Sequence, residues 1–502
     1  MADERHEDSL GLDEPVDATT RRKFIKTTAT VAAAVVVGCG GDEGGLDGSV
    51  PDTGVSDTGG SDTSAMDTGA ADTSVPRDTA TDTAPPPVDP PEMVPEASAL
   101  FGLGVASGDV SHEDGVVWTR YSGTMPLVVT VWEMNGDVYE RTVLDEAASP
   151  AAGGFVHVSV PGLSGGRRYR YVFFVMDGSA RAERSPIGHF RAALAPDQME
   201  DLVIGACSCT KNGRDFGTLE RAGERDDLDA FLLLGDTTYN DDASNLDEHR
   251  ALWAENLGTP GYRTTRAATS MLATWDDHEV RNNFDGEDTG LEDGRQAFFE
   301  NLPLKRDAAN PERMWKSIRW GATAEIFVLD CRGERLPSTR GTTDEYISRA
   351  QMDWLKAGLM ASPAVFKIII NSVPIADFPT AFDVARNDRW EGYPLQRTEI
   401  LAHIDDNAIP GVLWVAGDFH LCSAQTVSTA GQPGGSQVEI LAGPGGNTGN
   451  PATWLLRADR RFEFASTTNN YVTLTLLPRT NTIRVAWIDG DGIVFETQEY
   501  VY

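Results

Sequence analysis

The sequence predicts an α/β protein in which a mixed β-sheet core is flanked by helices and preceded by a small all-β sandwich domain of immunoglobulin or fibronectin type. Three observations lead to this prediction. Short alternating apolar runs separated by turn residues fill residues 98–195, a pattern typical of antiparallel strands. Continuous apolar runs separated by longer helical stretches fill residues 196–502, as expected for buried strands of an α/β core. The last two runs, 471–477 and 482–487, predict a terminal hairpin.

The length and charge of the chain limit its function. At 502 residues the chain is long enough for two or three domains with a sizeable core. The formal net charge of −35 repels phosphate backbones, so we expect no nucleic-acid-binding patch. Part of this charge lies outside the folded domains, since residues 42–93 hold twelve acidic side chains and the single base Arg77. Local cations or metal ions must therefore attract any anionic substrate.

Residues 1–39 resemble a twin-arginine signal peptide. Arg21 and Arg22 precede the Ala/Val-rich run 27–38, which is too short to span a bilayer. The less favoured alternative is a basic turn before a buried helix. We therefore expect export by the twin-arginine machinery.

The same run ends in Val36-Val37-Gly38-Cys39, which is similar to a bacterial lipoprotein processing box. In such a box Cys39 becomes the lipid-modified N-terminus. An ordinary signal peptide with an incidental cysteine is the alternative. We expect a periplasmic or cell-surface lipoprotein that contacts the membrane through its lipid anchor only.

Residues 40–97 are predicted to form a disordered linker rich in Asp, Thr, Gly and Pro. Asp-Thr pairs recur in it at Asp52, Asp57, Asp62, Asp67 and Asp72. Such a composition cannot bury a core. Calcium binding is the alternative, but repeats without a ligand-bearing loop are more often solvated spacers.

The sandwich domain, residues 98–195, contains four clear strand patterns, at 116–120, 127–132, 155–160 and 169–174. We find no catalytic cluster in this domain.

In residues 196–502, buried strands are predicted at 202–206, 231–234, 271–274, 326–329, 366–370, 412–416 and 438–441. Residues 348–359 carry apolar side chains at helical spacing. Strands and helices in this order favour a mixed sheet.

These strands end in potential metal ligands. In open α/β sheets the side chains just beyond the carboxyl ends of the strands converge on one crevice. The residues at these positions are Cys207 and Cys209, Asp236 and Tyr239, Asp276, Asp277 and His278, Asp330 and Arg332, Asn371, and Asp418 and His420. Carboxylates suit hard cations, whereas thiolate and phenolate suit a ferric ion, so this set predicts a polynuclear metal site.

The motifs resemble those of the PhoD-type alkaline phosphatases, which are metallophosphoesterase-like phosphatases and phosphodiesterases. The similarity covers nearly everything after Ser98. It rests on residues 101–109 and 115–120, Gly205-Ala206-Cys207-Ser208, Gly235-Asp236 with Tyr239, Trp275-Asp276-Asp277-His278-Glu279, Leu329-Asp330-Cys331-Arg332, Asp388-Arg389-Trp390-Glu391-Gly392-Tyr393 and Gly417-Asp418-Phe419-His420. The block from Trp275 to Glu279 is the most specific. The resemblance implies a metallophosphatase-like mixed β-sandwich.

The resemblance also implies roles for individual residues. Fe³⁺ would be held by Cys207, Asp236, Tyr239 and Asp418, with Asp236 bridging to neighbouring Ca²⁺; another divalent metal is the alternative. Asp277 and His420 would serve the second metal region. His278 would stabilise or protonate the leaving oxygen.

The remaining motif residues surround these ligands. Arg332 is expected either to bind phosphate oxygens or to form a salt bridge that holds Asp330. Asp276 and Glu279 are expected to support the ligands from behind. Asn282 and Asn283 follow the block without an assigned role.

The chain departs from its relatives at some positions. Leu421-Cys422-Ser423 follows His420, where relatives commonly have a small residue and Trp. Cys209 lies beside the predicted ligands. In an exported protein it could form a disulfide with Cys331 or with Cys422, and the sequence does not choose between them. A disulfide at Cys207 would prevent it from serving as a thiolate ligand.

We therefore expect a metal-dependent alkaline phosphatase or phosphodiesterase that acts on phosphate-ester small molecules or lipid head groups. A metal-activated oxygen would attack phosphorus directly, without a covalent phosphoenzyme. No Gly-x-Ser-x-Gly elbow supports a serine nucleophile. The alternatives are a phospholipase D-like activity on membrane lipids and a catalytically inactive, surface-anchored binding protein.

Overall fold

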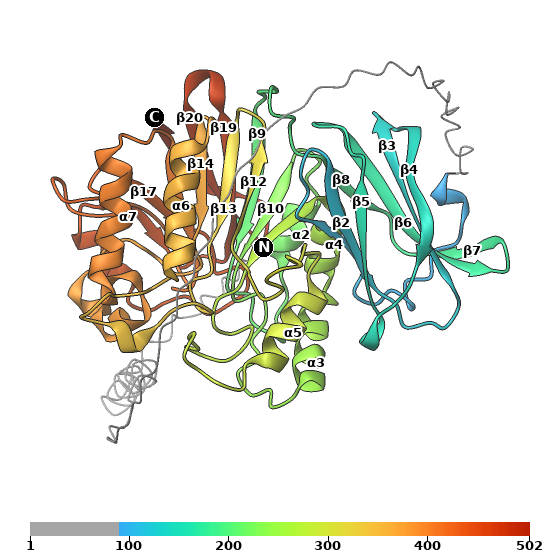
Figure 1. Ribbon diagram of the computed structural model, residues 1–502, viewed down its shortest axis with the longest axis horizontal. Helices are drawn as coiled ribbons and strands as arrows, with labels where there is room; N and C mark the ends of the chain where they lie inside the picture. The colour runs from blue at the N-terminus through green and yellow to red at the C-terminus, as the bar shows by residue number, and fades with distance from the viewer. Residues whose placement is uncertain (1–89) are drawn as a thin grey trace, which may run out of the picture. The chain divides into compact units, whose positions relative to one another are not determined.

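Two mixed β-sheets packed face to face form the centre of the protein, which a computed structural model describes over residues 90–502 (Figure 1). The nine-stranded sheet has the order β21 (Val494–Val501), β20 (Thr482–Asp489), β19 (Asn470–Leu477), β9 (Leu202–Cys207), β10 (Ala230–Leu234), β11 (Ser270–Thr274), β1 (Val105–Gly108), β2 (Asp114–Arg120), β5 (Phe155–Pro161). The seven-stranded sheet has the order β12 (Lys316–Trp320), β13 (Ala324–Val328), β14 (Phe366–Ile370), β15 (Val412–Ala416), β17 (Val438–Leu441), β16 (Cys422–Thr426), β18 (Phe462–Ser466). The predictions for the signal, Cys39 and nearly all of the linker lie outside the described residues.

The core between the two sheets is apolar on both sides. Ile204, Leu232 and Leu272 of the nine-stranded sheet and Ile368 and Val415 of the seven-stranded sheet belong to one cluster of buried side chains. Burial of each such side chain contributes roughly 1.5–3 kcal/mol. All seven strands and the terminal hairpin predicted for residues 196–502 are confirmed, because strands covered on both faces read as continuous apolar runs.

Helices cover the outer faces of this sandwich. Figure 1 shows α6 (Arg349–Ala361) and α7 (Pro394–Asp406) beside the seven-stranded sheet, and their apolar faces share a buried cluster with β14 and β15. The nine-stranded sheet is covered by α2 (Gly217–Gly223), α3 (Leu246–Leu257), α4 (Pro260–Ala268) and α5 (Glu292–Asn301). The helix predicted at 348–359 is α6, which begins after Ser348 because that hydroxyl caps the Gln351 N–H at 3.1 Å.

A third, five-stranded sheet forms the N-terminal β region. It contains β4 (Val138–Ala148), β3 (Leu127–Asn135), β6 (Arg168–Asp177), β7 (Ala180–Arg184) and β8 (Gly188–Arg191). The four strands predicted in this region are confirmed as β2, β3, β5 and β6. The sheet packs on β1, β2 and β5, so the second layer of this sandwich consists of the outer strands of the nine-stranded sheet.

Side chains tie this β region to the helices of the α/β part. The Trp118 indole N–H donates to the Glu300 carbonyl at 2.8 Å, and the Arg266 guanidinium lies 4.4 Å from the Trp118 ring centroid. The parallel pairing of β1 with β11 adds a backbone link next to the predicted metal loop. The two regions therefore share both a sheet and a core.

No helix among residues 90–502 is long and apolar enough to cross a membrane.

Candidate metal centre

The predicted site residues lie in loops that follow parallel strands. Strands β9, β10 and β11 are parallel, as are β13, β14 and β15, so their carboxyl ends meet at one edge of the sandwich. The site residues occur at the same distance from the strand ends: Cys209, Asp236, Asp276, Asp330 and Asp418 each lie two residues beyond the last residue of a strand. The sequence motifs are thus brought together by topology.

The backbone at several of these positions is left-handed. Cys209, Asp236, Asp418 and His420 have φ values of 57°, 54°, 65° and 51°. For residues other than glycine this conformation costs on the order of 1–3 kcal/mol and persists only where the surroundings enforce it. The tight turn before Asp236 uses Gly235, at φ 93°, where a Cβ atom would lie 2.5 Å from the Asp276 backbone nitrogen. The strands therefore hold the loops that carry the potential ligands in a backbone conformation of raised free energy.

The first potential metal-binding group consists of Cys209, Asp236 and His420, whose ligand atoms lie within 4.8 Å of one another. The Tyr239 hydroxyl joins this group, at 3.0 Å from Asp236 Oδ2 and 2.9 Å from His420 Nε2. The Asn447 side-chain amide donates to the Tyr239 oxygen at 2.7 Å. A thiol, a carboxyl, an imidazole and a phenol therefore converge at one point.

The second group consists of Asp236, Asp277 and His278. His278 stacks on the Tyr239 ring, with centroids 4.1 Å apart, and its Nδ1 lies 2.7 Å from the Asp241 carboxylate. Burial lowers the pKa of His278, but the charges of Asp277, Asp236 and Asp241 outweigh it and raise the pKa to about 11. Asp236 belongs to both groups and therefore stands between two potential cation sites.

Unpartnered buried oxygens show that these groups fit metal ions. Asp236 Oδ1 and Asp277 Oδ1 are buried without a hydrogen-bond partner. Burial and the carboxylates of Asp276, Asp277 and Glu279 raise the pKa of Asp236 well above its usual range, although the charge of His278 opposes this. Buried anionic oxygens require a compensating charge, and a cation between these carboxylates would supply it.

His420 has the protonation state that a metal ligand needs. Burial, followed by the charge of His278, lowers the pKa of His420 to about 4. The imidazole is therefore neutral above this pH, as metal ligation requires.

Asp418 lies in the loop after β15 and belongs to neither group of potential metal ligands. Burial is the main cause that raises the pKa of Asp418 well above its usual range, and its strongest electrostatic partners are Asp276 and Arg332. His420 groups with Cys209 rather than with Asp277, and the expected role of Asp418 as an iron ligand stays a prediction.

Arg332 is locked in a buried ion-pair network. Its Nε and Nη2 atoms donate to the two oxygens of Asp276 at 2.6 and 3.1 Å, and its Nη1 donates to Asp388 Oδ1 at 2.7 Å. The side chain is fully buried. The guanidinium pairs with Asp276 and Asp388 and not with Asp330, so the expected salt bridge to Asp330 is wrong, while phosphate binding by Arg332 stays a prediction.

Glu279 and Asp330 organise the loops by accepting backbone hydrogen bonds. Glu279 accepts from Thr237 N at 2.5 Å and from Asp276 N at 2.9 Å, and so joins the loops after β10 and β11. Asp330 Oδ1 accepts from the Trp275 indole at 2.7 Å and from Gly333 N at 2.7 Å. Both carboxylates therefore hold the loops that carry the potential ligands.

Asn282 and Asn283, which follow the block from Trp275 to Glu279, differ in their contacts. Asn283 N donates to Asp277 Oδ2 at 2.6 Å, so its backbone orients a potential ligand. Asn282 is exposed.

The structure exchanges one predicted ligand for another. The Cys207 thiol donates to the carbonyls of Ser208 and Asn470, at 3.7 and 3.6 Å, and lies in a hydrophobic cluster rather than in either metal group. Burial raises the pKa of Cys207 to about 12. Cys209, two residues further on, takes the place expected for Cys207.

The described cysteines are all free thiols, so the open pairings of Cys209 with Cys331 or Cys422 are not formed. The Cys331 thiol donates to Asn371 Oδ1 at 2.9 Å, and the Cys422 thiol donates to the Ser466 carbonyl at 3.4 Å.

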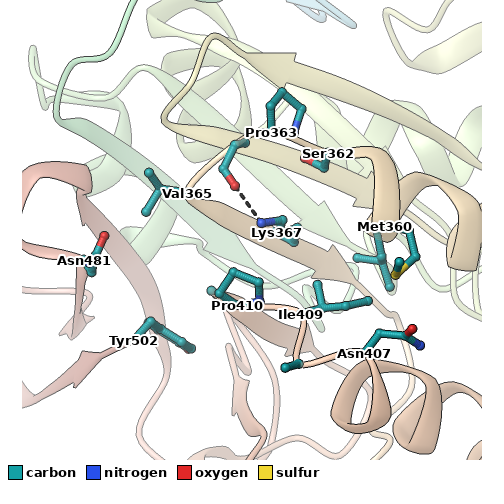
Figure 2. Close-up of a pocket in the computed structure, with 14 residues that line it drawn as sticks. Met360, Ser362, Pro363, Val365, Lys367, Asn407, Ile409, Pro410, Asn481 and Tyr502 are labelled. Atoms are coloured by element: carbon teal, nitrogen blue, oxygen red, sulfur yellow. Dashed lines mark hydrogen bonds between the residues drawn. The ribbon is translucent and has the colours of Figure 1, made fainter.

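A separate hollow of about 490 Å³ lies at the opposite end of the strands (Figure 2). It is lined by the loops that precede β14 and β15, including Pro363 and Pro410, and by Tyr502, which follows β21. The Lys367 ammonium at this hollow donates to the Ala364 carbonyl at 2.7 Å. The hollow holds no cluster of metal-binding side chains comparable to the loops at the other edge.

Solved phosphatase structures have the same architecture. The structure of PhoD superimposes with a TM-score of 0.68 at 21% identity, covering 81% of this chain and 90% of that chain. Purple acid phosphatase PPD1 from yellow lupin (Lupinus luteus) seeds superimposes with a TM-score of 0.57 at 15% identity, covering 79% and 73% of the two chains. Fold and site together define a metallophosphatase-like hydrolase of phosphoric esters.

The PhoD-like phosphatase model matches residues 202–475, more than half of the chain, and the model of the PhoD-like phosphatase N-terminal domain matches residues 89–194. The chain therefore belongs to the PhoD-like phosphatase family. Alkaline phosphatase D of Bacillus subtilis (strain 168) is 25% identical over 452 residues, which cover 76% of each chain.

Proposed function

We propose that this family member hydrolyses phosphate mono- and diesters in a metal-dependent reaction, with Fe³⁺ and Ca²⁺ as the resident ions. The supporting observation is Asp236, whose carboxylate belongs to both potential metal groups and carries an unpartnered buried oxygen. Thiolate and phenolate are ligands that suit Fe³⁺, so Cys209, Tyr239 and His420 favour iron on their side of Asp236. Carboxylates suit Ca²⁺, so Asp277 favours calcium on the other.

Activity assays on simple esters test this proposal. The full-length protein, loaded with iron and calcium, should hydrolyse bis-p-nitrophenyl phosphate, p-nitrophenyl phosphate or both, and elemental analysis should find metal. Absence of turnover on both esters and of choline release from lipid, together with absence of metal, would leave only the binding-protein alternative. Release of choline from phosphatidylcholine vesicles without turnover of the simple esters would instead indicate the phospholipase D-like activity.

The ligand assignment predicts opposite results for two neighbouring cysteines. Cys209→Ser should lose most of the bound iron and the visible charge-transfer absorption, because it removes the thiolate beside Asp236. Cys207→Ser is the matched control and should keep both, since its thiol faces Asn470. Metal analysis and absorption spectra of the two purified variants provide the measurement. Iron loss in Cys207→Ser with retention in Cys209→Ser would overturn the assignment.

Neighbouring side chains orient His278, the proposed proton donor. When bound, the metal ions would polarise the phosphoryl group and activate water for attack on phosphorus. Asp241 accepts from His278 Nδ1 and the Tyr239 ring supports the imidazole, so Nε2 is the atom that remains to donate a proton to the leaving oxygen. Arg332 holds Asp276 in place next to Asp277.

His278→Gln should lower kcat by about 10²–10³-fold for phenyl phosphate, whose leaving group needs a proton. The loss should be roughly ten times smaller for p-nitrophenyl phosphate, because a better leaving group depends less on an acid. Steady-state kinetics on both esters and metal analysis provide the measurement. Equal losses on both esters, or a loss of metal, would make His278 a ligand rather than a proton donor.

We further propose that the protein is exported as a lipoprotein. The supporting residues are Arg21, Arg22 and Cys39, in the segment 1–39. Replacing Arg21 and Arg22 by Lys should keep the protein inside the cell, and Cys39→Ala should release it from the membrane fraction. Unchanged fractionation of both variants would contradict the proposal.

A further inference from the structure

Two arginines near the metal centre are buried away from solvent. Arg332 is fully buried between Asp276 and Asp388. Arg389 is also fully buried, with its guanidinium 5.3 and 5.0 Å from the ring centroids of Phe378 and Phe419. Neither guanidinium is exposed to an anion in solution.

Lys211 is a cation near the same site that solvent can reach. It is exposed and lies two residues beyond Cys209. Its ammonium lies 5.8 Å from the centroid of the Tyr239 ring, whose hydroxyl is 2.9 Å from His420 Nε2. The charge of Lys211 is therefore positioned beside the first metal group, on its solvent side.

The backbone around Lys211 is held in place. Its N–H donates to the Gly446 carbonyl at 3.2 Å, and the preceding Thr210 N–H donates to the Asp236 carbonyl at 2.9 Å. These bonds connect the loop after β9 to the loop that carries Asp236 and to the loop that carries Asn447. The Lys211 side chain therefore starts from a fixed point relative to the ligands.

Lys211 has no carboxylate partner. Among the ion pairs of residues 90–502, Arg332 pairs with Asp276 and Arg281 with Asp288, whereas Lys211 takes part in none. In a chain with a net charge of −35, an unpaired cation beside a metal centre is free to bind an anionic ligand.

We propose that Lys211 binds a non-bridging phosphoryl oxygen of the substrate and thereby favours dianionic monoesters and inorganic phosphate over monoanionic diesters. A monoester carries one more negative charge than a diester at alkaline pH, and a cation at the rim interacts with that additional charge. This inference rests on the proposed function and names the substrate preference of the same site.

Lys211→Gln tests the inference in the metal-loaded, full-length protein. The variant should raise KM for p-nitrophenyl phosphate and the inhibition constant of inorganic phosphate by about tenfold, the effect of one lost charge-assisted contact. For bis-p-nitrophenyl phosphate the change in KM should stay below about threefold, because this ester lacks the second charge. The values of kcat and metal content should stay near wild type, and Lys211→Arg should retain the wild-type preference.

Arg214→Gln is the matched control in the same exposed loop, where the guanidinium donates to Thr448 Oγ1 at 3.0 Å. Arg214→Gln should change neither the preference for monoesters over diesters nor the inhibition by inorganic phosphate. If Arg214→Gln reproduced the effect of Lys211→Gln, a general electrostatic field would explain the data and the specific contact would be refuted. Equal losses on both esters would also refute it.

The proposed function and the role of Lys211 can fail separately. If the wild-type protein hydrolysed neither ester, the proposed function would fail. Calorimetric titration of the metal-loaded protein with inorganic phosphate would still decide the role of Lys211, since Lys211→Gln should weaken phosphate binding by about tenfold. Unchanged phosphate affinity would overturn it.

Discussion

Replacing Asp236 by Asn is expected to lower kcat/KM for phosphate esters by at least about a thousandfold. Asp236 is shared by the two potential metal groups, and an amide cannot supply the negative charge that two cations require. Asn also adopts the left-handed backbone that Asp236 has at φ 54°, so the substitution removes the charge without disturbing the turn. Kinetics on bis-p-nitrophenyl phosphate and elemental analysis of the purified variant measure the effect.

The same substitution is expected to stabilise the metal-free protein. The raised pKa of Asp236 means that its ionised form is less favourable in the folded than in the unfolded chain, so stability is lost as the pH rises above the ordinary Asp value. In a chelator at neutral pH, Asp236→Asn should therefore melt at a higher temperature than wild type. Asp242→Asn, at an exposed neighbouring position, should change neither activity nor melting. Retained metal with activity within tenfold of wild type would contradict the bridging role.

Replacing Arg332 by Met is expected to lower the free energy of unfolding by about 3–5 kcal/mol. The substitution leaves the buried carboxylates of Asp276 and Asp388 without the guanidinium that lies 2.6 and 2.7 Å from them. Activity should fall with stability, because Asp276 lies next to the proposed ligand Asp277. Urea unfolding of the metal-free protein measures the change without a contribution from bound ions.

Two controls separate this effect from the loss of any arginine. Arg281→Met removes an exposed pair with Asp288 and should cost less than about 1 kcal/mol. Adding Asp276→Asn to Arg332→Met should recover part of the lost stability, because it removes one of the uncompensated charges. A loss below about 1 kcal/mol for Arg332→Met would show that the network is not needed for folding.

The sequence was sufficient to predict the sandwich core, because its strands are covered on both faces and read as continuous apolar runs. The choice of the thiol ligand was harder. The family resemblance matched Cys207, in the motif Gly205-Ala206-Cys207-Ser208, to the thiolate ligand. Strand β9 includes Cys207, whose side chain lies in a hydrophobic cluster, whereas Cys209 lies in the loop beyond the strand and belongs to a potential metal group. With two cysteines so close together, the motif alone did not identify the ligand.

Other site residues could not be recognised from local sequence at all. Asp241 and Asn447 lie outside the matched motifs, yet they hold His278 and Tyr239. The role of Arg332 depends on Asp388, which lies 56 residues away in the chain. Such partners are set by tertiary contacts, so no pattern of apolar spacing or motif length reports them.

The pairing of β1 with β11 affects how the chain can be divided. Strand β11 is hydrogen-bonded to β10 on one side and to β1 on the other. A catalytic half cut at residue 195 would present β11 as a bare edge strand directly before the metal loop, open to pairing with other chains. The N-terminal β region therefore protects the edge of β11 by pairing with it. A single cooperative calorimetric transition is expected for residues 90–502. Two separate transitions would show that the N-terminal β region and the hydrolase region unfold independently.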